Sequence, residues 1–201
     1  MKLFFSPASP YVRKVMIVAH ELGLAGRIEK LPAAAGPVKR DQTIRPVNPI
    51  AQVPTLLTDD GTALYDSRVI CEYLDDLGGG RFFGQGAERW RNLTDAALGD
   101  GLLGAALLVR YESVLRPEPY RWTDWIGGQS EKITDAADRI ERLAPALGDR
   151  LDIGTVTLFC ALGYLDFRFP DLAWRATRPA AAAWFERFSA RPSAQATMPS
   201  G

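Results

Sequence analysis

The sequence has almost none of the residues that bind metals or form disulfides. It contains two cysteines, Cys71 and Cys160, and a single histidine, His20. The cysteines are far apart and show no Cys-x-x-Cys or metal-like spacing, so we expect two reduced thiols in the core. One histidine without neighbouring ligand residues argues against a zinc site and against a histidine-based catalytic triad. We therefore expect no metal, and we expect His20 to be structural or to face solvent.

Net charge and long apolar runs are also missing. Twenty-four basic and twenty-four acidic side chains cancel, which leaves no broad electrostatic attraction for nucleic acid or for an acidic membrane surface. No run of about 18 apolar residues appears, and the N-terminus shows no basic region followed by an apolar segment and a cleavage site. We therefore expect a cytoplasmic protein that binds neither nucleic acid nor membranes.

The most informative stretch is the loop at residues 6–9. It follows a short apolar run at residues 3–5 and precedes apolar residues at the spacing of a helix face. Ser9 stands where an N-cap belongs, and Pro10 stands at the first helical position, where its missing N–H costs nothing. The pattern predicts a strand, a tight loop and a helix, with Ser9 at the positive helix end, where an anion is stabilised. Taken alone, it more often marks an ordinary helix cap.

Strand signals are confined to the first 65 residues, and the chain after residue 87 is predicted to be helical. The predicted order is β-α-β-α-β-β-α, followed by helices only. The first half is predicted to contain a strand at 27–31, a loop with at most a short helix at 33–49, a strand pair at 55–57 and 63–65 around Asp59-Asp60-Gly61, and a helix from Asp66 to the glycines at 78–80. The second half is predicted to contain long helices at 90–111 and from 126 to about Ala144, where Pro145 disfavours helix, a helix capped by Asp152 and Thr155, and a last main helix from Pro179.

Three glycines interrupt the first long helix. Gly99, Gly101 and Gly104 would each cost about 1 kcal/mol relative to alanine in a helix interior. We therefore expect either that another backbone approaches this helix closely or that the helix lines a cleft.

Several motifs, taken in order, resemble the serine-containing, bacterial-type members of the glutathione transferase superfamily. These motifs are the strand, loop and serine-capped helix at 3–22, Val53-Pro54 before the third strand, Asp66-Ser67 at a helix start, Ala161 to Arg168, and Arg191 to Ser193. Each is weak alone, but together they cover essentially the whole chain. The resemblance implies an α/β plus all-α fold: a thioredoxin-like, glutathione-binding domain at 1–78, a linker at 79–86 and a helical bundle domain at 87–201.

The resemblance also implies roles for individual residues. Ser9 would activate the glutathione sulfur, although Ser6 is a competing candidate that we expect to face back into the loop. Val53 and Pro54 would form a cis-proline corner that pairs with the cysteinyl part of glutathione. The remaining glutathione contacts implied by the family are Asp66 and Ser67 at the γ-glutamyl end, and Gln52 and Lys39 at the glycyl carboxylate.

Two features depart from the family pattern or stay open at this stage. The family's frequent Gly-Lys before Val-Pro is replaced here by Ala51-Gln52, so the glycyl contact would become a neutral hydrogen bond. Which residues form the walls of the electrophile pocket, expected between the domains, is also undecided, because ordinary core packing explains each candidate equally well. The candidates are Tyr11, Leu103, Leu107 and Tyr111.

The function implied by the resemblance is attack of a glutathione thiolate on an electrophilic small molecule, in detoxification, by a homodimer. The helix around Gly99 to Gly104 is the candidate for a close contact in that dimer. A second hypothesis is a non-catalytic binding or regulatory protein that keeps the fold. Glutathione-dependent isomerase, dehalogenase or peroxidase activity is a further alternative. The sequence does not identify the second substrate.

Overall fold

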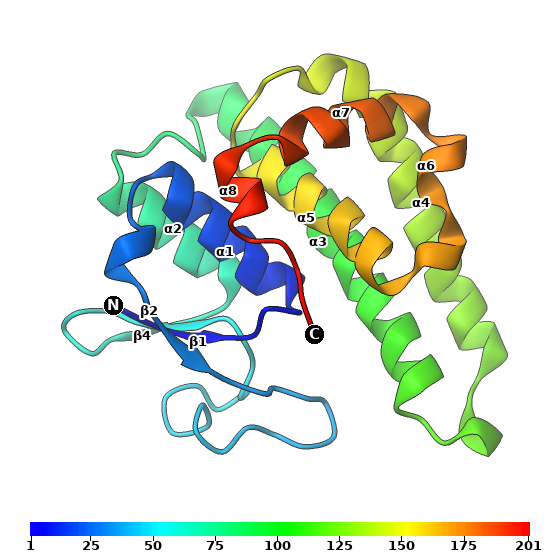
Figure 1. The fold of residues 1–201 in the computed structure, drawn as a ribbon, viewed down its shortest axis with the longest axis horizontal. Coiled ribbons are helices and arrows are strands. Elements are labelled where there is room, and N and C mark those ends of the chain that lie inside the picture. The colour runs from blue at the N-terminus through cyan, green and yellow to red at the C-terminus, as the bar shows by residue number, and fades with distance from the viewer. The chain divides into compact units, whose positions relative to one another are not determined.

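The computed structural model describes residues 1–201 and divides into two compact units (Figure 1). The first unit contains Met1–Glu88 together with Pro192–Gly201, and the second contains Arg89–Arg191. The predicted boundaries had placed the whole of 87–201 in the helical domain. The structure groups the last ten residues with the first unit instead.

The first unit is built on a four-stranded mixed sheet in the order β2-β1-β3-β4. The strands are β1 (Lys2–Phe5), β2 (Glu29–Pro32), β3 (Thr55–Leu57) and β4 (Ala63–Leu64). β1 pairs with β2 in parallel, whereas the β1–β3 and β3–β4 pairs are antiparallel. All four predicted strands are present. Residues 33–54 contain turns and no helix, so the second helix of the predicted order, the short one allowed within 33–49, is absent.

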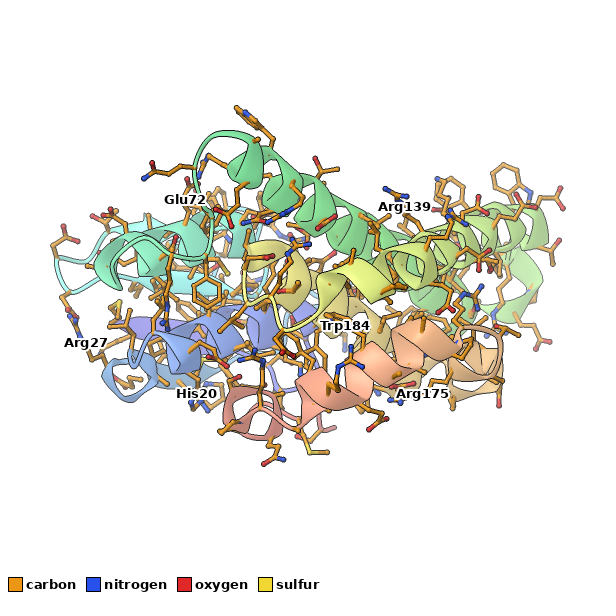
Figure 2. The ribbon with its side chains drawn as sticks, turned by 90° about the horizontal axis from the view of Figure 1, so that it is seen from above. His20, Arg27, Glu72, Arg139, Arg175 and Trp184 are labelled. Carbon is orange, nitrogen blue, oxygen red and sulfur yellow. The ribbon has the colours of Figure 1, made fainter.

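Two helices, α1 (Pro10–Glu21) and α2 (Ser67–Leu77), pack against each other in this unit. The helix α1 is covered along most of its length, and even Lys14 is fully buried. A short 3-10 helix, η1 (Ala25–Arg27), follows α1. His20 lies in the last turn of α1 and is half-buried (Figure 2).

The C-terminal segment packs on α1 through two specific contacts. The short helix α8 (Pro192–Gln195) follows Arg191. The Ser193 hydroxyl donates to the Glu21 carboxylate over 2.6 Å, and Arg13 Nη2 donates to the Ala194 carbonyl over 3.4 Å. These bonds explain why residues far apart in the sequence belong to one unit.

The second unit is entirely helical. Its helices are α3 (Gly86–Val114), α4 (Thr123–Leu147), α5 (Ile153–Arg168), α6 (Trp174–Thr177) and α7 (Pro179–Ser189), with 3-10 turns η2 (Glu118–Tyr120) and η3 (Pro170–Leu172). The helix α5 is the core element, because every residue from 153 to 165 is buried. The sequence predicted this central role from its apolar stripe.

The predicted end of α4 was wrong. The helix continues through Pro145 to Leu147, and Gly148 follows with φ of +51°. Ala144 and Leu147 are each 1% exposed. Burial of these two side chains overrides the preference of the residue before proline for an extended conformation.

The backbones of α3 and α5 approach each other closely at two glycines. A β-carbon at Gly99 would lie 3.0 Å from the Thr157 carbonyl carbon and oxygen, and one at Gly154 would lie 2.9 Å from the Asn92 carbonyl oxygen. The predicted close approach is therefore confirmed for Gly99, within the chain. Nothing lies within 4 Å of a β-carbon at Gly101 or Gly104.

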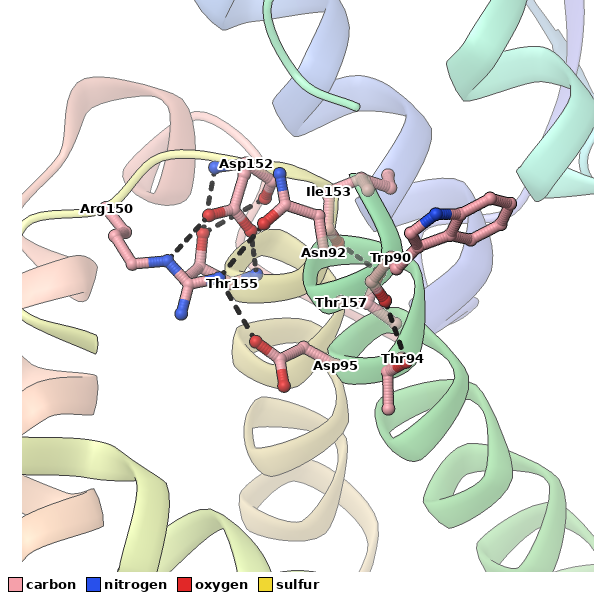
Figure 3. A network of polar contacts seen from close by, with 9 residues as sticks. All are labelled: Trp90, Asn92, Thr94, Asp95, Arg150, Asp152, Ile153, Thr155 and Thr157. Atoms are coloured by element: carbon pink, nitrogen blue, oxygen red, sulfur yellow. Dashed lines mark hydrogen bonds and ion pairs between the residues drawn. The ribbon is translucent and has the colours of Figure 1, made fainter. Parts of the chain in front are cut away.

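A polar network closes the start of α5 (Figure 3). Asp152 accepts from the Thr155 backbone N–H over 2.9 Å, and the Thr155 hydroxyl lies 3.0 Å from the Asp152 backbone N–H, which forms the predicted capping box. Arg150 donates to Asp152, Asn92 and Asp95 over 2.9–3.2 Å. The network joins α3 to α5 and satisfies the carboxylates there.

Both cysteines are free thiols and fully buried, as predicted. No group of three or more histidine, cysteine, aspartate or glutamate side chains could hold a metal ion. One helix, α3, is long and apolar enough to cross a membrane by length and composition, but half of its apolar window is buried inside the protein. The core helices of globular proteins share this property, so the finding is weak evidence for a membrane span.

Candidate functional site

The candidate residues of the first unit follow the strand ends at one edge of the sheet. The register pairs Phe4 in β1 with Thr55 in β3, and Leu56 with Leu64 in β4. Since β1 and β4 both run antiparallel to β3, their carboxyl ends lie beside the start of β3. The loop carrying Ser9, the Val53-Pro54 corner and the Asp66-Ser67 helix start therefore all leave the sheet at this edge.

Ser9 caps α1, as the sequence predicted. Its backbone is extended, with φ of −84° and ψ of 121°, and its hydroxyl oxygen accepts a hydrogen bond from the Val12 N–H over 3.3 Å. The serine is half-buried, and no acidic residue occupies the first turn of the helix. Because a hydroxyl has one proton and two lone pairs, this capping bond leaves the Ser9 proton available for donation to a ligand.

Hydrogen bonds among neighbouring residues hold the turn before β3. The Asn48 side chain donates to the Thr55 hydroxyl over 2.8 Å and accepts from the Ile50 N–H over 3.0 Å. Thr55 in turn donates to the Gln52 carbonyl over 2.7 Å. The Val53–Pro54 bond is cis, as the resemblance implies.

Ala51, which replaces the glycine of the family pattern, has an unusual backbone conformation in this turn. Ala51 has φ of +55°, in the left-handed region that glycine enters at lower cost than alanine. Its methyl group is buried in a small cluster with Phe4 and Ile44. Burial of the methyl group offsets part of the backbone cost.

Asp66 and Ser67 form the start of α2. The Asp66 carboxylate accepts from the Arg68 backbone N–H over 2.9 Å and pairs with the Arg68 guanidinium over 2.8 Å. These bonds, first of all that with the Arg68 side chain, lower the pKa of Asp66, and the positive charge of Lys14 adds to the effect. Ser67 is buried at the first position of the helix. Hydroxyl and backbone N–H groups at a helix N-terminus suit a carboxylate.

The two candidates for the glycyl carboxylate are both exposed. Gln52 lies directly before the cis-proline corner, whereas Lys39 lies in the long loop between β2 and β3. Asp41 organises that loop by accepting from the Ala34 N–H over 2.9 Å and from the Thr43 N–H over 2.8 Å. The Lys39 side chain is exposed on this loop, and its role stays a prediction.

The candidate electrophile-pocket residues belong to different units. Tyr11 is half-buried on α1, and the Lys14 ammonium lies 5.8 Å from the centre of its ring. Leu103, Leu107 and Tyr111 recur every four residues on α3, so they share a face. Leu103 is fully buried, in agreement with core packing, while Leu107 and Tyr111 are half-buried. That these residues line a pocket stays a prediction.

Sequence reasoning missed three residues that shape this edge. Asn48 and Thr55 hold the turn, and Lys14 places a buried positive charge near Asp66. An asparagine and a threonine on either side of Val53-Pro54 were the available signal for the turn. A lysine within the apolar repeat of α1 was the signal for the buried charge.

The comparison with protein families covers almost the entire chain. Residues 8–77 match the family model described as the glutathione S-transferase N-terminal domain, and residues 74–187 match the glutathione S-transferase C-terminal domain. The Escherichia coli (strain K12) uncharacterized GST-like protein YibF is 31% identical over 205 residues, which cover 99% of this chain and 98% of the relative.

Solved structures of similar proteins agree. A glutathione transferase family member from Pseudomonas fluorescens Pf-5 with bound glutathione is 45% identical, with a TM-score of 0.96, over 100% of this chain and 99% of its own. A glutathione S-transferase from Methylobacillus flagellatus KT with glutathione bound is 29% identical, with a TM-score of 0.90, over 99% of both chains. With both family models matched in order and a relative similar over its full length, the chain belongs to the glutathione S-transferase superfamily.

Proposed function

We propose that this protein is a glutathione transferase in which Ser9 donates a hydrogen bond to the glutathione thiolate, and the thiolate attacks an electrophilic small molecule. The observation that carries the proposal is the spare proton of Ser9, at the start of α1 and at the sheet edge where the other candidate residues emerge. Two relatives that are similar to this chain over nearly their whole length have been solved with bound glutathione, which supports the choice of ligand.

The required stabilisation is within reach of this arrangement. A cysteine thiol has a pKa of about 8.5, and lowering it by about two units takes about 2.7 kcal/mol of preferential stabilisation of the thiolate. A hydrogen bond to a charged group supplies about 1.5–3 kcal/mol, and a helix N-terminus supplies about 0.3–1 kcal/mol more. Ser9 on α1 provides both contributions, and it needs neither a metal nor a histidine base.

The rest of the glutathione molecule would follow the sheet edge. In this proposal the backbone of Val53, next to Pro54, pairs with the cysteinyl part, and Asp66 and Ser67 hold the γ-glutamyl end. Gln52 would contact the glycyl carboxylate, with Lys39 as a second candidate. Tyr11, Leu103, Leu107 and Tyr111 remain the candidates for the electrophile pocket.

Conjugation is favoured over a binding role by one comparison. The Pseudomonas fluorescens Pf-5 family member, 44% identical in this structure, has also been solved with S-(propanoic acid)-glutathione, a glutathione whose sulfur carries a substituent. A site that accommodates such a ligand in the relative supports thiol conjugation in this chain. A role in detoxification, the homodimer and the cytoplasmic location stay predictions from the sequence.

The test compares Ser9→Ala with Ser6→Ala, which makes the same chemical change in the same loop. Calorimetry should show that glutathione binds to the wild-type protein and both variants, because the thiol contact is one of several. Conjugation of a small aromatic electrophile should fall about tenfold to a hundredfold in Ser9→Ala, the loss expected when a hydrogen bond of about 1.5–3 kcal/mol is removed and the helix N-terminus stays, and should be retained in Ser6→Ala. If the wild-type protein fails to bind millimolar glutathione, the proposal is wrong and the binding-protein hypothesis replaces it.

A further inference from the structure

The C-terminal segment, Pro192–Gly201, belongs to the first unit and lies along α1. Figure 1 shows this segment, in red, running from α8 to the start of α1. The Ser193 hydroxyl donates to the Glu21 carboxylate over 2.6 Å at the far end of the helix. Gly201 lies beside Ala8, because a β-carbon at Gly201 would be 4.0 Å from that of Ala8. The segment therefore reaches from the last turn of α1 to the loop that precedes its first turn.

Arg13 connects the C-terminal segment to the start of α1. Its backbone N–H donates to the Ser9 carbonyl oxygen over 3.0 Å, which is the first hydrogen bond of the helix. Its guanidinium Nη2 donates to the Ala194 carbonyl oxygen over 3.4 Å. Arg13 is 8% exposed and Ala194 is 1% exposed, and removing one partner of a buried hydrogen bond is costly. One residue thus joins the Ser9 backbone to the C-terminal segment.

The Ala194 carbonyl is held in place within the C-terminal segment. The Thr197 hydroxyl lies 2.8 Å from the Ser193 carbonyl oxygen and 3.3 Å from the Ala194 carbonyl oxygen. Ser193 is 4% exposed, and its own hydroxyl is bonded to Glu21. Since a carbonyl oxygen has two lone pairs, Ala194 can accept from Arg13 and from Thr197 together. The acceptor that Arg13 meets is therefore fixed by neighbouring bonds.

The position of the Ser9 hydroxyl depends on the first turn of α1. Ser9 is half-buried, and its oxygen accepts from the Val12 N–H over 3.3 Å, slightly longer than the usual upper limit of about 3.2 Å. A bond of this length holds the hydroxyl only weakly. Donation to a ligand needs the hydroxyl at a defined place, and a misplacement of about 1 Å costs up to about a hundredfold in rate. Residues that fix the turn itself therefore matter for the proposed chemistry.

We propose that Arg13 is a positioning residue for the reaction, and that the C-terminal segment, through the Ala194 carbonyl, keeps the Ser9 hydroxyl where it meets the glutathione sulfur. Arg13 acts here through the geometry of the first turn rather than through its charge. The inference rests on the proposed function and adds that activation of the thiol depends on a contact between residues 181 positions apart in the sequence.

The experiment uses two matched pairs of variants. Ser193→Ala removes the bond to Glu21 without changing any charge, and Ser200→Ala makes the same change at an exposed serine of the C-terminal segment. Arg13→Met is matched by Arg27→Met, because Arg27 is an exposed arginine of the same unit (Figure 2). Three quantities are measured for each protein: the pKa of the bound glutathione thiol by ultraviolet absorbance, kcat and KM for conjugation, and the free energy of unfolding in urea.

Arg13→Met should raise the pKa of the bound thiol by about one unit relative to the wild-type protein, which corresponds to about tenfold weaker stabilisation of the thiolate. Ser193→Ala keeps the Arg13 side chain but loosens the segment that it contacts, so we expect a rise of about half a unit. In both variants kcat should fall at neutral pH while KM for glutathione changes little. Ser200→Ala and Arg27→Met should match the wild-type protein, and Arg13→Lys, which retains a donor, should recover part of the loss.

A double variant separates position from charge. Arg13→Met also removes a positive charge, and a charge near the sulfur would stabilise the thiolate directly. If Arg13 acts through Ser9, Arg13→Met should leave the thiol pKa unchanged in a Ser9→Ala background, because the two residues are then coupled and their effects do not add. A further rise of the thiol pKa in that background would assign the effect to charge and overturn the positioning role.

Loss of stability in Arg13→Met and Ser193→Ala, with the thiol pKa and kcat of the folded variants unchanged, would overturn the inference and leave the proposed function standing. If Arg13→Met does not fold, Arg13→Lys and Ser193→Ala decide by the same measurements. If the wild-type protein does not lower the thiol pKa, or Ser9→Ala lowers it equally, the proposed function fails, and the positioning role of Arg13 fails with it.

Discussion

The N-termini of α1 and α5 are capped by different kinds of side chain. At α5 the cap is charged and buried: Asp152 accepts from Thr155, pairs with Arg150 and is 5% exposed. At α1 the cap is neutral and half-buried, and the Ser9 hydroxyl accepts one hydrogen bond, from the Val12 N–H over 3.3 Å. The protein's own side chains satisfy the N-terminus of α5, whereas the Ser9 hydroxyl at the N-terminus of α1 can still donate a hydrogen bond.

The difference separates a structural cap from a candidate binding cap. A buried carboxylate at the start of α5 already neutralises the positive helix end, so no anion is needed there. The start of α1 has no acidic residue in its first turn, and a bound thiolate would supply the missing negative charge. The same type of helix end therefore serves stability in one unit and, in our proposal, chemistry in the other.

The largest expected effect on stability comes from Asp152→Ala. The change removes the capping box and leaves Arg150 with one carboxylate fewer, so we expect a loss of about 2–3 kcal/mol in the free energy of unfolding. Urea unfolding followed by circular dichroism measures it. Asp149→Ala, an exposed aspartate next to the network, should cost under about 0.5 kcal/mol. Ser9→Ala should cost under about 1 kcal/mol, and a loss as large as that of Asp152→Ala would break the comparison.

A smaller effect is expected at the third helix start, that of α2. The pKa of Asp66 is lowered, chiefly by its bond with the Arg68 side chain, so its carboxylate stabilises the folded state above the unfolded pKa of about 3.9. That contribution is lost as the pH falls through 3.9 toward the lower folded value. It should stay under about 1 kcal/mol, because the pair is largely exposed.

The variant Asp66→Asn tests this sign, since asparagine retains the capping ability. Unfolding free energies of the wild-type protein and the variant should differ at pH 5 and converge as the pH approaches 3. A difference that stays constant over this range would show that the Asp66 charge does not contribute.

Local signals in the sequence predicted most of the elements. Caps at Ser9, Asp66 and Asp152 and apolar periodicity located the helices, because these features act within a few residues. The predicted end of α4 was wrong because burial of Leu147 outweighs the local effect of Pro145. Tertiary packing, which periodicity does not encode, decides such cases.

The candidate site divides in the same way. The position of Ser9 at a helix start could be predicted from the neighbouring residues, whereas the bond from Asn48 to Thr55 depends on how a turn folds back on itself. The bond from Ser193 to Glu21 and the bond from Arg150 to Asn92 join segments more than fifty residues apart. No local pattern in the sequence predicts those contacts.

The most direct test of the account is the pKa of the glutathione thiol in the bound state, followed by the ultraviolet absorbance of the thiolate against pH. We predict that the wild-type protein and Ser6→Ala lower this pKa by about two units from the free value of about 8.5, while Ser9→Ala binds glutathione and leaves the pKa near the free value. A thiol that ionises equally readily in Ser9→Ala would contradict the role of Ser9 and of the open helix end that it caps.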